Sequence, residues 1–171
     1  SEFFDEHFCL FKYKGEVRNH IIQYKFNEKS YYYKGFSQLF VEDKTFTEKF
    51  ICNYDVIISV PIHRKRMSKR GYNQSELIAK EISRNCNIKY CKKALKKITN
   101  TVAQSSLDDK KLRKNNTKDA YVPDDYIGEV VNKKIAIFDG VFTTGATANE
   151  CAKVLKQCGA SYVGVFTIAK S

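Results

Sequence analysis

The sequence predicts an α/β fold, a mostly parallel twisted sheet flanked by helices, and its apolar runs are the first observation behind this prediction. Val56–Val60, Ile135–Phe138 and Val163–Ile168 are short and predominantly apolar, as expected for strands buried on both faces of a sheet. A helical pattern from Ala146 to Cys158 separates the last two runs. Strand, helix and strand at this spacing form a βαβ unit, and such units build parallel sheets.

The length and charge of the chain favour one domain that binds an anion. Its 171 residues are about the length of a single α/β domain. The 30 Lys and Arg against 19 Asp and Glu leave a net charge of +11, which suggests nucleic acid, an anionic membrane face or a small substrate with several phosphates. No apolar run approaches the ~20 residues of a membrane span, and the chain does not start like a signal peptide. We therefore expect a soluble, cytoplasmic protein.

The first 50 residues are predicted to form a helical N-terminal extension of an α/β core at residues 54–171, within a single domain that covers residues 1–171. Apolar residues recur at helical spacing after Gly15 and again after Ser30. The many aromatic residues of this extension also make it a candidate homodimer face. The recurring positions are Val17, Ile21, Ile22 and Phe26, followed by Phe36, Leu39 and Phe40.

Neither the six cysteines nor the three histidines form a recognisable metal site. No C-x-x-C pair is present, and Cys86 and Cys91 lack a second pair that would complete a tetrahedral zinc site. We therefore expect free thiols and no zinc in this chain. The histidines lie far apart in the sequence, and nothing marks one of them as a ligand or a base.

Ligands of parallel sheets bind beyond the carboxyl ends of the strands, so the turns after Val60 and Phe138 are the candidate sites. Pro61 ends the first of these strands, and Asn73 has the pattern of a helix N-cap. The segment between Pro61 and Asn73 carries five basic residues and no acid. It is an anion-binding loop, a solvated basic loop, or part of a nucleic-acid patch together with the lysines of Lys92–Lys114.

The second turn, Asp139–Thr147, combines features that suit a phosphate with one that suits a sugar. Its threonines and Gly145 lead into a helix, whose first N–H groups have no intrahelical partner and whose dipole favours an anion. Asp139, at the end of the strand, suits sugar hydroxyls rather than a phosphate. A 5-phosphorylated ribose would satisfy both halves, whereas helix capping alone is the simpler alternative.

This turn resembles the phosphoribosyl pyrophosphate (PRPP) motif of type I phosphoribosyltransferases, with four apolar residues, an acid, a short spacer and Thr-Thr-Gly-Ala-Thr. More narrowly, the chain resembles the ComF family, which is linked to bacterial competence and DNA uptake. Val60–Arg66 and Arg70–Gln74 resemble the proline–arginine signature of that family, and Leu10–Phe26 resembles its helical lead-in. The resemblance implies a type I phosphoribosyltransferase fold. The residues that echo the family's middle segment are Gln104, Leu107, Arg113 and Asn116.

The resemblance also implies a magnesium-dependent transfer of phosphoribosyl from PRPP to an unidentified acceptor, a reaction that needs positioning and charge rather than a protein nucleophile. Asp139 would orient the ribose hydroxyls, and Mg²⁺ would arrive with PRPP and lie near Asp139 through water, with no direct protein ligand. Arg64, Arg66 and Arg70 would contact the pyrophosphate, Arg66 and Arg70 as catalytic residues, and Lys96–Lys114 would form a hood over the site. The residues expected to contact PRPP are Val60, Pro61, Ile62, Arg64, Asp139, Gly140, Val141, Phe142, Thr143, Thr144, Gly145, Ala146 and Thr147.

Departures from the family pattern leave a second hypothesis open. Gly140 stands where type I transferases usually place a second acid, and Lys97 and Thr99 stand where the family usually has arginines. In this alternative the fold is catalytically weak or inactive and acts in DNA uptake as a single-stranded-DNA-binding or adaptor module, with DNA-uptake proteins as partners. The PRPP motif and the proline–arginine signature occur together, which favours PRPP binding over simple helix capping, and we favour PRPP binding more strongly than turnover.

Overall fold

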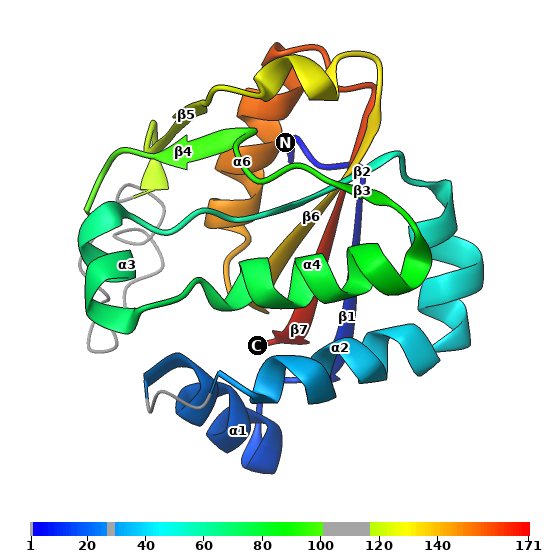
Figure 1. Ribbon diagram of the computed structural model, residues 1–171, viewed down its shortest axis with the longest axis vertical. Coiled ribbons are helices and arrows are strands. Elements are labelled where there is room, and N and C mark those ends of the chain that lie inside the picture. Colours follow the sequence, from blue (N-terminus) through cyan, green and yellow to red (C-terminus); the bar gives the residue numbers. More distant parts are fainter. Residues whose placement is uncertain (1, 27–29, 101–116) are drawn as a thin grey trace.

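The computed structural model describes residues 2–26, 30–100 and 117–171. A central sheet lies between helices, and a two-stranded ribbon stands beside it (Figure 1). The strands are β1 (Glu6–Lys12), β2 (Val56–Ser59), β3 (Lys89–Tyr90), β4 (Leu95–Lys97), β5 (Tyr121–Pro123), β6 (Lys134–Phe142) and β7 (Tyr162–Lys170). The helices are α1 (Gly15–Phe26), α2 (Tyr32–Glu42), the π-helix η1 (Thr45–Phe50), the 3₁₀-helix η2 (Ile51–Asn53), α3 (Arg64–Arg70), α4 (Gln74–Cys86), the 3₁₀-helix η3 (Ile127–Val130) and α6 (Ala146–Gln157).

The main sheet has five strands in the order β1-β7-β6-β2-β3, and each neighbouring pair is parallel. The parallel sheet predicted from the βαβ pattern is therefore confirmed. Strands β4 and β5 pair antiparallel in a sheet of their own. Because parallel strands point the same way, their carboxyl ends share one edge of the sheet, and α1 lies beyond that edge (Figure 1).

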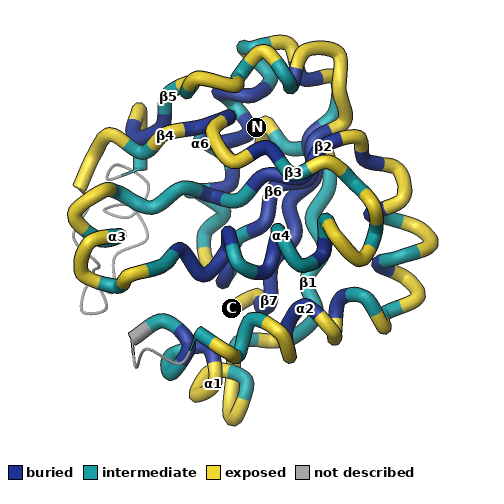
Figure 2. Tube along the Cα trace, viewed as in Figure 1, coloured by how far each residue is buried: buried dark blue, intermediate teal, exposed yellow. Residues whose placement is uncertain are grey.

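Helices cover both faces of the sheet, and β6 contributes to a separate core on each side. Ile135 and Ile137 belong to the core that α6 closes, whereas Ala136 and Phe138 belong to the core that α1, α2 and α4 close. All four side chains are at most 1% exposed. Side chains of successive strand residues point to opposite faces, so a strand buried on both sides must be apolar throughout, as this segment is. Figure 2 shows the buried stretches concentrated in the central strands.

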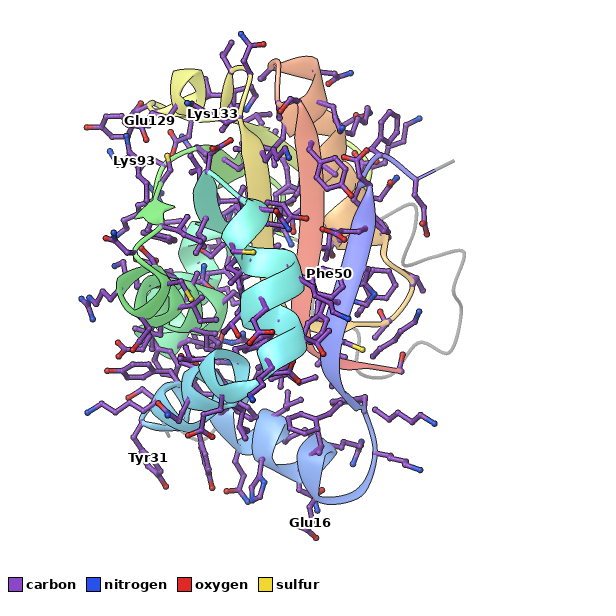
Figure 3. All side chains as sticks on the ribbon, turned by 90° about the vertical axis from the view of Figure 1, so that its right-hand side faces the viewer. Glu16, Tyr31, Phe50, Lys93, Glu129 and Lys133 are labelled. Carbon is purple, nitrogen blue, oxygen red and sulfur yellow. The ribbon has the colours of Figure 1, made fainter. Side chains whose placement is uncertain are left out.

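An aromatic layer joins the N-terminal part of the chain to the sheet. The rings of Phe138 and Phe166 stack with their centroids 5.3 Å apart, and Phe46 of η1 meets Phe166 edge-on at 5.5 Å. Phe40 of α2 meets Phe138 edge-on at 5.5 Å. The ring centroids of Phe8 of β1 and Phe50 are 5.1 Å apart, and Figure 3 shows Phe50 beside the sheet. Residues before 54 thus supply one wall of the core on the α1, α2 and α4 side of the sheet.

The prediction of helices throughout the first 50 residues is wrong for residues 6–12. These residues form β1, an edge strand that pairs parallel with β7, with Phe8 opposite Phe166. Its apolar run Phe8–Phe11 is as long as Ile135–Phe138, but six of its seven residues are only half-buried, as expected of an edge strand. Helices do follow at α1, α2 and η1, as predicted. The homodimer face expected here stays a prediction.

Two segments that were predicted as turns have regular structure. Strand β6 continues through Asp139 to Phe142, which pairs with Lys170 of β7, so only residues 143–145 separate it from α6. The basic segment after Pro61 forms α3, because the His63 ring caps its start by accepting the Lys65 N–H at 3.2 Å. No helix in residues 2–26, 30–100 and 117–171 is both long and apolar enough to cross a membrane.

Candidate functional site

A cleft of about 720 Å³ opens at the carboxyl ends of β2 and β6. Helix α1, helix α3, the start of α4 and the start of α6 surround it. The structure brings both predicted turns to this one cleft. The predicted residues that line it are Val60, Pro61, Ile62, Arg66, Arg70, Asp139, Gly140, Val141, Thr143, Thr144, Ala146 and Thr147.

Three predicted PRPP contacts lie elsewhere. Arg64 occupies the exposed first position of α3 and does not line the cleft. Phe142 and Gly145 line a smaller cavity of about 30 Å³, which the chain forms between the end of β6 and the start of α6. The predicted middle-segment residues, and the hood from residue 101 onwards, lie outside the described residues. The middle-segment residues are Gln104, Leu107, Arg113 and Asn116.

Helix α3 presents two arginines to the cleft. Arg66 and Arg70 are one turn apart and therefore lie on the same face of the helix. The Arg70 Nη1 donates to Gln74 Oε1 at 3.2 Å, which fixes the guanidinium against the start of α4. Burial lowers the pKa of Arg70, and the neighbouring charge of Arg66 lowers it further. Two cations held this close together on a cavity wall favour a ligand with more than one negative charge.

The start of α4 ties the other walls of the cleft together. The Asn73 side chain accepts the Ser75 N–H at 3.1 Å, which confirms the predicted N-cap, and its Nδ2 donates to the Val60 carbonyl at 3.0 Å. The Gln74 side chain donates to the Lys25 carbonyl at 3.2 Å, and the Tyr24 hydroxyl donates to the Gln74 carbonyl at 2.7 Å. These bonds hold α1 against α4 across the cleft.

Asp139 is the acid at the centre of the site. Its Oδ1 accepts the backbone N–H of Gly140 at 2.7 Å, and a hydrogen bond from the Ser75 side chain also stabilises its charged form. Burial raises the pKa of Asp139, and the nearby Lys25 charge opposes this rise. The carboxylate is thus held at the end of β6, where hydroxyl groups of a ligand can donate to it.

The loop that follows β6 has the geometry of an anion site. Gly145 is the N-cap of α6, with φ 73°, and has no side chain that could cap the helix. The Ala146 N–H approaches Thr144 Oγ1 at 3.4 Å. The residues at the start of this 12-residue helix and the threonines before it line the two cavities, and the first N–H groups of a helix lack intrahelical partners and attract anions. Only glycine fits at position 145, because a β-carbon there would lie 2.6 Å from the Phe142 ring.

Strand β1 holds Phe142 in place, a role that the sequence did not reveal. The His7 ring stacks on the Phe142 ring, and the Phe4 ring meets it edge-on with centroids 6.0 Å apart. A hydrogen bond of 2.9 Å joins His7 Nε2 to Thr167 Oγ1. Burial, followed by the charge of Lys170, lowers the pKa of His7 to about 4, so the ring is neutral at pH 7. These partners lie about 135 and 160 positions away, and no local pattern could have indicated them.

Two lysines complete the cleft. Lys25 of α1 reaches across to Gly140, and its Nζ lies 3.7 Å from the position that a β-carbon there would occupy. Lys97 of β4 lies over the Tyr121 ring at 5.2 Å, and Tyr121 in turn hydrogen-bonds to Thr147. Lys25 lies within Leu10–Phe26, the segment that resembles the helical lead-in of the family. The sequence offered no sign that its side chain reaches the acid of β6.

The side chains described do not fit a magnesium ion held by the protein. In residues 2–26, 30–100 and 117–171, no three His, Cys, Asp or Glu side chains gather as metal ligands. Magnesium prefers several oxygen ligands in octahedral geometry, whereas the described cleft wall offers the single carboxylate of Asp139 with the Lys25 ammonium near it. Magnesium that arrives with PRPP and reaches Asp139 through water stays a prediction.

Solved structures are similar to this chain in fold. The allosteric regulatory enzyme of purine biosynthesis superposes with a TM-score of 0.50 at 18% identity, over 82% of this chain and 25% of that chain. The glutamine PRPP amidotransferase of B. subtilis gives a TM-score of 0.49 at 18% identity, over 82% of this chain and 26% of that chain. The first likeness is one of fold alone, and it agrees with the mostly parallel sheet flanked by helices. The predicted fold class is confirmed.

Curated relatives identify the family. Competence protein F of Haemophilus influenzae is 32% identical over 117 residues, which are 68% of this chain and 51% of that protein. The DNA utilization protein YhgH of Escherichia coli O6:H1 is 34% identical over 120 residues, 68% of this chain and 50% of that protein. Competence protein ComFC of Bacillus subtilis is 24% identical over 168 residues, 95% of this chain and 63% of that protein. The chain belongs to the ComF family, as its motifs indicated.

The chain spans about half the length of competence protein F and YhgH. No family model matches it.

Proposed function

We propose that the cleft binds PRPP, or a closely related 5-phosphorylated ribose that carries a pyrophosphate. The observation that carries the proposal is the meeting of two anion sites and one acid in a single cleft. The Thr143–Thr147 loop and the α3 arginines both line it, and Asp139 lines it as well. A 5-phosphate at the loop, ribose hydroxyls at Asp139 and a pyrophosphate at Arg66 and Arg70 would use all three.

The charge of the cleft supports a polyanionic ligand. The described wall carries five basic side chains and one acidic side chain, Asp139. A cavity lined by one sign of charge raises the local concentration of oppositely charged ligands and speeds their association. The five basic residues are Arg18, Lys25, Arg66, Arg70 and Lys97.

Transfer of the phosphoribosyl group to an acceptor is the reaction that we propose for this site. The bond between ribose C1 and the pyrophosphate oxygen breaks, the pyrophosphate leaves with the bonding electrons, and the acceptor forms the new bond to C1. Charge-assisted hydrogen bonds from Arg66 and Arg70 would stabilise the leaving group. Asp139 would orient the sugar through its hydroxyls. None of these steps needs a protein nucleophile.

Calorimetric titration of PRPP into the wild-type protein and into Arg66→Ala and Arg70→Ala tests this proposal. We expect each substitution to weaken PRPP binding about tenfold or more, because hydrogen bonds to charged groups contribute roughly 1.5–3 kcal/mol. Arg84→Ala is the matched control, since Arg84 is 73% exposed and pairs only locally with Glu81. No measurable PRPP binding by the wild type, with and without magnesium, would refute the proposal. A screen of base acceptors for pyrophosphate release then tests turnover.

Binding of single-stranded DNA is the second candidate, and the names of two relatives favour it. Those relatives are a competence protein and a DNA utilization protein, and this chain has a net charge of +11. DNA affinity should fall steeply with added salt, because each neutralised phosphate releases counterions. Fluorescence anisotropy with a labelled oligonucleotide measures this dependence. An affinity that does not respond to salt, or no binding at low salt, would exclude this candidate.

A further inference from the structure

The side chain of Lys25 occupies the space beside Gly140, immediately after the acid of the site. A β-carbon at position 140 would lie 3.4 Å from Lys25 Cε and 3.7 Å from Nζ. The end of the Lys25 side chain would therefore be in ordinary van der Waals contact with a side chain at position 140. Lys25 and Asp139 interact electrostatically, and each favours the charged form of the other.

Lys25 is held in this place by its own backbone. The Gln74 side chain donates to the Lys25 carbonyl and accepts from Arg70. Helices α1, α3 and α4 are therefore joined through Gln74. Burial lowers the pKa of Lys25, and the charges of Arg70 and Arg66 lower it further. An ammonium placed among arginines is costly unless an anion accompanies it. Asp139 alone does not balance the positive charges of Lys25, Arg66 and Arg70. This end of the cleft therefore favours an anionic ligand.

A divalent cation bound close to the Lys25 ammonium would be repelled by it. Mg²⁺ bound to the pyrophosphate beside Asp139 would enter the immediate surroundings of this ammonium, and like charges repel strongly where water is excluded. The ammonium already supplies positive charge and hydrogen-bond donors at that position. The described wall has no second carboxylate that would hold the hydrated ion.

We propose that Lys25 binds the ribose pyrophosphate directly over Gly140 and that the cleft therefore takes its ligand as the metal-free anion. This inference rests on the proposed function and specifies the form in which the ligand binds. It makes Lys25 a binding residue. It also accounts for glycine at position 140, because an acidic side chain there would meet the ammonium and compete for it.

The test is calorimetric titration of PRPP in excess EDTA and in excess MgCl₂. We expect the wild type to bind PRPP more weakly in MgCl₂ than in EDTA, because excess Mg²⁺ complexes the free anion that the cleft takes. Lys25→Met should weaken binding in EDTA about tenfold or more, and Lys25→Arg should retain most of the affinity. Lys133→Met is the matched control, because Lys133 is exposed before β6, at the opposite end of the molecule from Glu16 of α1 (Figure 3).

A second variant works in the opposite direction. Gly140→Asp places a carboxylate beside Lys25, and ordinary contact distances to the lysine tip leave room for it. We expect PRPP binding by this variant to weaken about tenfold in EDTA and to recover in MgCl₂, because the ion can then bridge two carboxylates and the ligand. This variant also decides the matter if Lys25→Met does not fold.

The outcomes separate the two proposals. Wild-type binding that requires MgCl₂ would overturn the metal-free inference and leave the proposed function standing. Equal affinity of Lys25→Met and the wild type in EDTA would also overturn it. Absence of binding in both conditions would instead refute the proposed function itself.

Discussion

The ring of His7 stacks on the ring of Phe142, with the centroids 4.0 Å apart and the planes 22° from parallel. Phe142 is the last residue of β6, directly before the loop that begins α6. Strand β1 therefore packs against the residue that precedes the proposed phosphate loop. Residues separated by 135 positions in the sequence act here as one structural unit.

Replacing the stacked ring should loosen that loop. We expect His7→Ala to lower the free energy of unfolding by about 1–2 kcal/mol, through loss of the ring contact and of the hydrogen bond to Thr167. PRPP affinity should fall several-fold as well. Chemical denaturation and calorimetry measure the two effects. His20→Ala is the control, because His20 is exposed on α1, has only a looser ring contact with Tyr32 at 5.6 Å, and should change both quantities less. Equal behaviour of the two variants would contradict this role.

Stability should depend on pH through the same ring. His7 has a pKa of about 4 in the folded protein, against 6.5 as its ordinary value, so the folded state favours the neutral ring. Its stabilising contribution is fully present above about pH 6.5 and is lost as the pH falls through 4. Denaturation curves across this range should show His7→Gln to be less sensitive to pH than the wild type. Parallel curves would show that His7 does not titrate in this way.

Gly145 should tolerate no side chain. Its φ of 73° is costly for other residues, and a β-carbon would lie 2.6 Å from the Phe142 ring. We expect Gly145→Ala to destabilise the fold by about 1–3 kcal/mol and to abolish measurable PRPP binding. Gly35→Ala is the matched control, because a β-carbon at exposed Gly35 of α2 meets nothing within 4 Å. That control should be stabilised by about 1 kcal/mol, as expected for alanine within a helix. An unfolding free energy that falls for Gly35→Ala and stays at the wild-type value for Gly145→Ala would contradict this expectation.

The acid of the site should distinguish a sugar from a bare anion. We expect Asp139→Ala to weaken PRPP binding about tenfold, because the acceptor for the ribose hydroxyls is gone. Affinity for inorganic pyrophosphate should stay equal or increase, since a negative charge beside Lys25 has been removed. Thermal unfolding of the variant verifies that it folds. Equal losses for both ligands would show that Asp139 does not act on the sugar.

The elements that the sequence predicted well are those with strong local patterns. Strands β2, β6 and β7 are apolar because both of their faces are buried, and this composition identified them directly. Helix α4 was identified by its cap, since Asn73 is the N-cap in the structure. Gly159 takes φ 96° after α6, as a glycine that ends a helix does.

The features that the sequence did not predict depend on distant residues. Strand β1 exists because β7 provides a parallel partner more than 150 positions later. Lys25 reaches Gly140 only because Gln74 fixes α1 against α4. The basic segment after Pro61 was predicted as a loop, but His63 provides a cap, and Gly71, with φ 77°, ends the short helix α3. Local secondary-structure propensity does not determine contacts between distant residues, so these features could not be predicted from the sequence.

In the proposed function, a sugar phosphate docks on the amides at the start of α6. The most direct measurement is the ¹H–¹⁵N correlation spectrum of the labelled protein during titration with ribose 5-phosphate and then with PRPP. We predict large shifts of the Thr144, Gly145 and Thr147 amides with both ligands, and additional shifts in α3 with PRPP alone. Saturable binding that leaves the amides of residues 143–147 unmoved would contradict the account.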